Sequence, residues 1–169
     1  MKIRPSTLLF AIVAAALLVW ALGTFTGEEG KVRRQLDRLG TVISKSQGEN
    51  ALATVDKASQ LIQLFSDDLT VDLGPYNQVI ADQRQLTRAY AGFRQSREDI
   101  RVGFSDTQIE LGDPLPTASM TTTATLSASG DGGGRGVYRL ALRWRKVEGD
   151  WRIEHLEILE VLDGIESFL

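Results

Sequence analysis

The sequence predicts an α+β protein in which one transmembrane helix precedes a domain of three helices and a mostly antiparallel sheet. Two observations predict this class. Apolar residues recur at helical spacing through most of the first half of the folded part, interrupted by one short alternating stretch. From about residue 99 onward apolar and polar residues alternate, as in strands that bury one face. The 169 residues suffice for one domain and an appendage.

The first 27 residues predict a membrane anchor, and residues 28–169 the folded domain. No charged residue lies between Arg4 and Glu28. Residues 7–26 within this run are about long enough to cross a bilayer, which makes the lipid bilayer a predicted partner.

Positive charge before the apolar run sets the predicted orientation. Lys2 and Arg4 favour a cytoplasmic N-terminus, a single pass through the inner membrane and a periplasmic domain. A cleaved signal peptide is the alternative, because Ala21-Leu22-Gly23 offers small residues at a cleavage-like spacing.

Three stretches of the domain predict amphipathic helices. The first covers residues 31–47, and the second runs from the N-cap Asn50 to about Phe65. The third follows a capping box formed by Asp82 and Gln85. Their apolar stripes are Val32, Leu36, Leu39, Val42 and Ile43; Leu52, Val55, Ala58, Leu61, Ile62 and Phe65; and Leu86, Tyr90 and Phe93.

One short strand and four long strands are predicted from the alternating stretches. The short strand lies at residues 69–73, between the second and third helices. In the first long strand the alternation changes phase between Phe104 and Ile109, which predicts a bulge. Glu148-Gly149 predicts a tight turn between the last two strands.

The glycine-rich stretch SASGDGGGRGVYR, residues 127–139, raises the question of phosphate binding. A phosphate-binding glycine loop leads from a strand into a helix, whose N-terminus faces the anion. Here strands are predicted on both sides, and Arg135 replaces the last glycine of the dinucleotide-binding pattern. The stretch therefore predicts a hairpin tip.

Composition excludes several classes of function. A net charge of −3 argues against nucleic-acid binding, which usually requires a basic excess, so no nucleic-acid partner is predicted. The absence of cysteine removes disulfides, thiolate zinc sites and iron–sulfur clusters. With a single histidine and no suitable carboxylate spacing, the sequence predicts no metal site and no cofactor.

The order of elements, the segment LFSDDLTVDL and the terminal hairpin WRKVEGDWRIEHLEI resemble the nuclear transport factor two-like superfamily (cystatin-like cone, SnoaL-like). The resemblance covers roughly residues 31–162. It implies a curved sheet wrapped around three helices, with a pocket between them. The superfamily includes isomerases, dehydratases, binding modules and scaffold subunits of envelope complexes. Its catalytic residues are not shared, so the resemblance assigns none here.

The tight turn also predicts which residues face the pocket. A two-residue loop pairs Trp144 with Ile153 and Leu142 with His155, which turns His155 toward the helices. The predicted ligand-binding residues are His155, Glu157, Tyr90, Tyr138 and Trp144. If the domain is an enzyme, His155 and Asp72 are the candidate catalytic pair of an isomerase or dehydratase. The alternative is a structural, partly buried histidine at the sheet edge.

The opposite face of the sheet is the predicted interaction surface. It carries Arg139 and Arg143 together with Leu156 and Ile158, two apolar residues that need cover. The resemblance implies a sheet-to-sheet homodimer at this face, and an envelope protein is the alternative partner. Together these features predict a non-enzymatic, membrane-anchored periplasmic module that holds a small apolar ligand or a partner protein. The isomerase or dehydratase and the envelope scaffold are the alternative functions.

Overall fold

The computed structural model describes residues 27–113, 116–130 and 133–164. Residues 1–26 of the predicted anchor, which include the apolar run at 7–26, lie outside these ranges. Within the ranges, no helix is both long enough and apolar enough to span a membrane.

Helices and strands follow one another as the sequence predicts. The structure adds two short elements between the predicted short strand and the third helix, a 3-10 turn and a two-residue strand. The helices are α2 (Glu28–Ile43), α3 (Ala51–Leu64) and α4 (Gln83–Gln95), with a 3-10 turn η1 (Gly74–Tyr76). The strands are β1 (Phe65–Asp72), β2 (Val79–Ile80), β3 (Arg97–Leu111), β4 (Thr117–Gly130), β5 (Gly134–Val147) and β6 (Asp150–Gly164). The predicted α+β class is confirmed for the described part of the chain.

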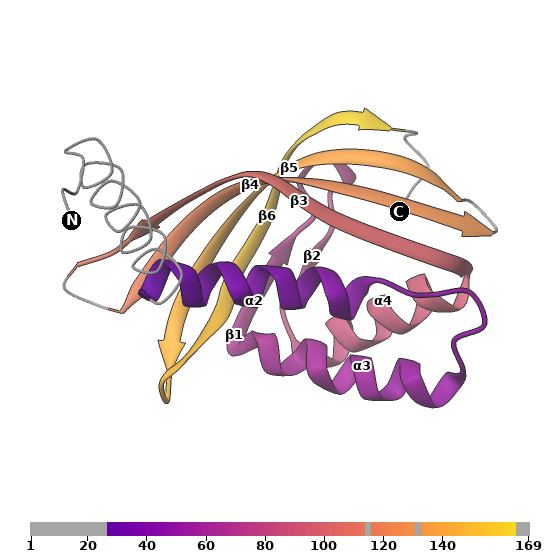
Figure 1. Cartoon of the computed structure of the whole chain (residues 1–169), viewed down its shortest axis with the longest axis horizontal. Coiled ribbons are helices and arrows are strands. Elements are labelled where there is room, and N and C mark those ends of the chain that lie inside the picture. The colour runs from indigo at the N-terminus through magenta and orange to yellow at the C-terminus, as the bar shows by residue number, and fades with distance from the viewer. Residues whose placement is uncertain (1–26, 114–115, 131–132, 165–169) are drawn as a thin grey trace, which may run out of the picture.

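The described strands form a single six-stranded sheet in the order β2-β1-β6-β5-β4-β3. All neighbouring pairs are antiparallel except β1 and β6, which are parallel. The sheet curves over α2, and α3 and α4 lie below that helix (Figure 1). This arrangement is the cone that the resemblance implies, and it leaves a space between the helices and the concave face.

Side-chain caps fix the starts of two helices. The Asn50 side chain accepts a hydrogen bond from the Ala53 N–H at 2.9 Å, and Asp82 accepts one from the Gln85 N–H at 2.8 Å. Both caps satisfy a backbone donor that the first turn of a helix leaves without a partner. The Gln85 side chain accepts from Ala81, one residue before the predicted capping-box position.

Bulges bend the long strands. The β3–β4 register shifts between Ser105 and Gln108, where Asp106 has a φ of 51°, so the predicted bulge is confirmed. The β5–β6 register shifts three times. Each extra residue on one strand turns the following side chains to the other face and increases the local bend.

The turns at the ends of the hairpins agree with the sequence. Glu148 and Gly149 both have positive φ values, 53° and 96°, as a two-residue hairpin turn requires. The glycine-rich stretch joins β4 to β5, strand to strand, as predicted for a hairpin tip.

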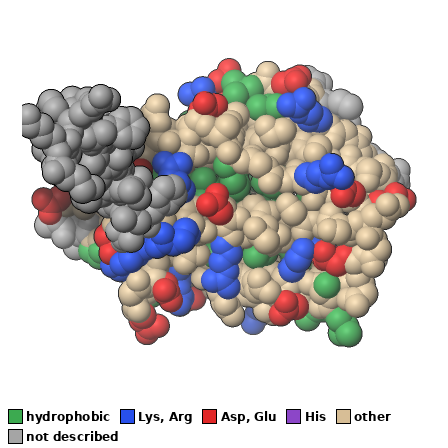
Figure 2. Space-filling view, viewed as in Figure 1, with side chains coloured by type: hydrophobic (Ala, Val, Ile, Leu, Met, Phe, Trp, Pro, Cys, Tyr) green, Lys and Arg blue, Asp and Glu red, His purple; other side chains and the backbone are tan. Residues whose placement is uncertain are grey.

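The helix stripes are buried with one exception. Val32, Leu36, Leu39 and Val42 of α2 are at most 2% exposed. The charged residues of α2 lie in its first part, up to Arg38, and Figure 2 shows charged side chains among uncharged ones on this face of the molecule. The predicted stripe of α3 is wrong in its first half: Leu52 is 79% exposed and Val55 is 65% exposed. The first turns of α3 extend past the surface that the rest of the helix covers.

An ion pair that the sequence pattern does not indicate fixes the end of α2. Arg94 of α4 is fully buried, and its Nη1 donates to the carbonyl oxygens of Ile43 at 2.8 Å and Ser44 at 3.0 Å. These carbonyls lie at the helix C-terminus, where no backbone N–H is available to them. The Arg94 Nη2 pairs with Glu49, which also binds Lys57 at 2.9 Å.

Candidate functional site

The candidate site is a cavity of about 200 Å³ between the helices and the concave face of the sheet. The helices contribute Leu39 and Ile43 from α2 and Phe93 from α4, while Leu73 follows β1. The remaining lining comes from the four long strands: Val102, Phe104, Ala124, Leu126, Tyr138, Leu140, Leu156 and Ile158. The predicted pocket of the cone therefore exists.

Strand register explains how the wall of this cavity is built. Phe104 of β3 pairs with Ala124 of β4, which in turn pairs with Tyr138 of β5. Paired residues point to the same face of a sheet, so two aromatic residues stand on either side of one small residue on the inner face. The methyl group of Ala124 takes up little of the cavity that all three residues line.

The cavity is apolar. Among the described residues that line it there is no Asp, Glu, His, Lys or Arg, and Tyr138 contributes the single hydroxyl group. Burial and the neighbouring hydroxyl of Tyr76 raise the pKa of Tyr138, so this phenol is neutral at physiological pH. The site can hold an uncharged apolar molecule and offer it one hydrogen bond.

The predicted pairing of the last two strands is wrong beyond its first step. Trp144 pairs with Ile153 as expected, but the next pair is Arg143 with His155, which leaves Glu154 as an extra residue. A one-residue shift moves every following side chain to the opposite face.

This bulge exchanges the two predicted surfaces. Leu156 and Ile158, predicted as an outer interface, point into the cone and line the cavity. His155 and Glu157, predicted as pocket residues, lie on the outer face instead, where they border a groove of about 610 Å³. In that groove the His155 Nε2 lies 3.7 Å from a carboxylate oxygen of Glu157.

The structure does not assemble the candidate catalytic set. Asp72 pairs with Glu157 in the β1–β6 register, and its carboxylate accepts a hydrogen bond from the Gly74 N–H at 2.8 Å. It thus holds a turn and shares the outer face with His155. Tyr90 donates its hydroxyl hydrogen to the Val42 carbonyl at 2.8 Å, and burial raises its pKa to about 12.

The other predicted site residues divide between core and surface. Trp144 is fully buried, but it lies outside the set of residues that line the cavity. Tyr138 is thus the predicted ligand-binding residue that the structure places at the cavity. Arg139 and Arg143 are exposed on the outer face, as predicted.

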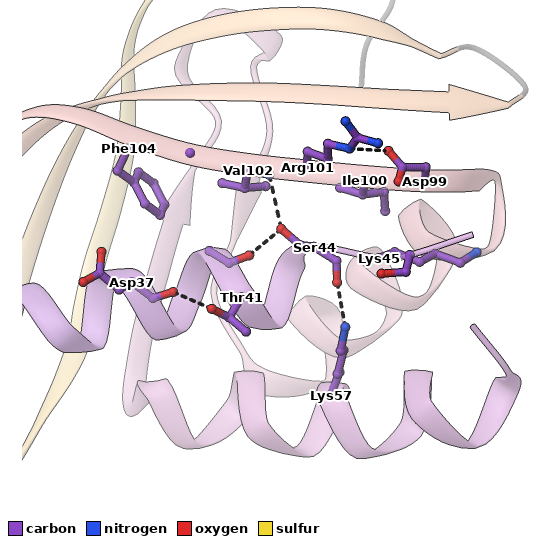
Figure 3. A pocket seen from close by; sticks show the side chains of 13 residues that line it. Asp37, Thr41, Ser44, Lys45, Lys57, Asp99, Ile100, Arg101, Val102 and Phe104 are labelled. Atoms are coloured by element: carbon purple, nitrogen blue, oxygen red, sulfur yellow. Dashed lines mark hydrogen bonds and ion pairs between the residues drawn. The ribbon is translucent and has the colours of Figure 1, made fainter. Parts of the chain in front are cut away.

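A polar groove of about 570 Å³ runs along the seam between α2 and β3 (Figure 3). Val102 and Phe104 line both this groove and the cavity, so these side chains form the wall between the two. Phe104 points from β3 toward α2, and the Ser44 hydroxyl accepts a hydrogen bond from the Val102 N–H at 3.2 Å. Sequence alternation predicts an inner face for both residues but does not indicate that they border a cavity.

Many solved structures match this fold, and three of them share 13 or 14% of their residues with this chain. A candidate scytalone dehydratase of Novosphingobium aromaticivorans superposes with a TM-score of 0.68 at 13% identity, covering 82% of this chain and 87% of its own. An NTF2-like protein of Cytophaga hutchinsonii gives a TM-score of 0.61 at 14% identity, with coverages of 79% and 100%. At such identities the similarity shows the fold alone.

A third similar structure is a protein of Nostoc punctiforme described as having a cystatin-like fold. It superposes with a TM-score of 0.60 at 14% identity and covers 79% of this chain and 90% of its own. Among curated proteins, none matches the sequence. The model of the SnoaL-like domain family matches residues 51–157, which is more than half of the chain. This protein therefore belongs to the SnoaL-like domain family.

Proposed function

We propose that the domain is a non-enzymatic binding module that holds an uncharged, apolar ligand of one or two rings in the cone cavity. The observation that carries this proposal is the lining: apolar side chains throughout, with the Tyr138 hydroxyl as the single polar group among the described residues. An ionised ligand would lose its hydration there without gaining a charged partner.

The volume of the cavity limits the size of the ligand. An engineered apolar cavity of about 150 Å³ in another protein binds benzene, whereas sites for drug-sized molecules measure about 300–1,000 Å³. The 200 Å³ of this cavity falls between these cases. It fits one ring, or two fused rings, and it supports binding of a small hydrocarbon or phenol-like molecule.

The positions of the titratable groups favour binding over acid–base catalysis. An isomerase or dehydratase needs a base within hydrogen-bond reach of its substrate. His155 and Asp72, the candidates for that role, lie on the outer face of the sheet. Tyr138 keeps its proton at neutral pH, which suits a hydrogen-bond donor rather than a base.

The location and partners of the module rest on sequence. The uncharged run at residues 7–26, preceded by Lys2 and Arg4, supports attachment to the inner membrane with the domain in the periplasm. Arg139 and Arg143 on the outer face remain the predicted contacts to a second copy of the chain or to an envelope protein.

Filling the cavity is expected to weaken binding. Ala124→Leu places a larger apolar side chain between Phe104 and Tyr138, so naphthalene binding measured by titration calorimetry should fall at least about tenfold. Ala141→Leu on the outer face is the matched control and should bind like the unmodified chain. Naphthalene-2-sulfonate should bind neither protein. Equal binding of the sulfonate and the hydrocarbon would contradict an apolar site.

A further inference from the structure

Gly136 lies beneath the aromatic ring of Tyr138. A Cβ atom at position 136 would lie 2.4 Å from the Tyr138 hydroxyl oxygen and 2.7 Å from two ring carbons. Real side chains do not approach so closely, so the ring occupies the space that any other residue at this position would fill. The absent side chain of Gly136 is what allows the ring to lie against its own strand.

The residues around Gly136 limit where the Tyr138 ring can move. On β6, Gly136 pairs with Gly164, which also lacks a side chain, and on β4 it pairs with Leu126. The Tyr76 hydroxyl lies beside that of Tyr138. The empty space that the ring borders is the cavity, which both Leu126 and Tyr138 line. A second hollow lies beside Tyr76 and Gly164, but Tyr138 does not line it, so we expect a ring displaced from Gly136 to enter the cavity that it already lines.

The backbone of Gly136 does not itself require glycine. Its φ is outside the left-handed region, unlike those of Gly130 and Gly164. An alanine at position 136 can thus adopt the same backbone conformation, and its effect is confined to the space that its methyl group takes.

We propose that Gly136 is a specificity-determining position that sets the upper size limit of the ligand, because it lets the Tyr138 ring lie against β5 instead of in the cavity. Gly136 acts through Tyr138 and is a positioning residue. This inference rests on the proposed function, since it assigns the size selectivity of the same cavity. The sequence presents Gly136 only as the end of a glycine-rich hairpin, and nothing in that pattern indicates this role.

The test is titration calorimetry of the full-length chain with benzene and naphthalene. Gly136→Ala should lower the affinity for naphthalene at least about tenfold and leave benzene bound. Gly103→Ala is the matched control, because it lies on β3 and a Cβ atom there meets nothing within 4 Å. A Gly136→Ala protein that binds both molecules like the unmodified chain would overturn the inference.

A double-mutant cycle separates displacement of the ring from a general loss of structure. In a Tyr138→Leu background, which has no ring to displace, Gly136→Ala should change naphthalene affinity less than about twofold. The same loss in both backgrounds would overturn the inference. Tyr138→Leu alone should admit anthracene, and this expectation does not depend on whether Gly136→Ala folds.

The inference and the proposed function can fail separately. If the unmodified chain binds neither benzene nor naphthalene, the proposed function is wrong. The crystal structure of ligand-free Gly136→Ala then decides the positioning role by itself. A Tyr138 ring turned into the cavity supports that role, and a ring left in place against β5 overturns it.

Discussion

Replacing Glu49 with glutamine is expected to lower the free energy of unfolding by about 3 kcal/mol, the low end of the range for breaking a buried ion pair. The Arg94 guanidinium that Glu49 binds is fully buried, and the Glu49 side chain is 12% exposed. Glutamine can still accept a hydrogen bond from Arg94, but it leaves the buried cation without a counter-charge. The loss should also loosen the end of α2, because Arg94 holds the carbonyls of Ile43 and Ser44.

Urea denaturation checks this expectation, with Glu29→Gln as the control. The Glu29–Arg33 pair is exposed at the surface, so its loss should cost less than about 0.5 kcal/mol. Equal losses for the two variants would contradict a structural role for the buried pair.

The pH dependence of the same pair follows from the pKa of Glu49. Burial raises that pKa. The hydrogen bond from Lys57 and the charge of Arg94 together lower it by more than burial raises it, so the pKa of Glu49 lies below its usual value of 4.5. The stabilisation is therefore complete above pH 4.5 and is lost as the pH falls through the lower folded-state pKa. The difference in stability between the unmodified chain and Glu49→Gln should shrink in acid.

Leu156→Arg is expected to unfold the domain or to cost several kcal/mol of stability. The Leu156 side chain faces the apolar cavity, where a guanidinium would find no carboxylate among the described lining residues. The sequence pattern alone, which places Leu156 on the outer face, predicts instead a soluble variant with a weakened interface.

His155→Arg is the matched control for this substitution. His155 precedes Leu156 on β6 but lies on the outer face, beside Glu157. We expect His155→Arg to change the free energy of unfolding by no more than about 0.5 kcal/mol, measured by thermal and urea denaturation. A stable Leu156→Arg protein together with an unfolded His155→Arg protein would show that the β6 register is the reverse of the one described.

Local signals in the sequence were sufficient for the order of elements. Asn50 and Asp82 are caps whose side chains satisfy nearby backbone donors, and Glu148-Gly149 adopts the positive φ values of a hairpin turn. The phase change in β3 correctly predicted its bulge, because the apolar residues on both sides of Asp106 reveal it. Each of these features depends on residues close together in the chain.

The site could not be predicted as fully, because it depends on contacts between distant segments. The bulge at Glu154 does leave a local signal, because apolar residues at positions 151 and 153 are followed by apolar residues at 156 and 158, a change of phase like the one in β3. Interpreting Leu156 and Ile158 as an outer apolar patch rather than as a change of register places both on the wrong face. Arg94 was missed for a different reason: a charged residue in an amphipathic helix predicts exposure, and only its distant carbonyl and Glu49 partners explain its burial.

The central claim is that the cone cavity is a binding site for an uncharged apolar ring, and crystals equilibrated with iodobenzene test it most directly. Anomalous scattering from iodine locates the probe without reference to any assay. The account predicts a peak inside the cavity, between Phe104 and Tyr138, that disappears in crystals of Ala124→Leu. A peak confined to the outer groove beside His155, or no peak inside the cone, would contradict it.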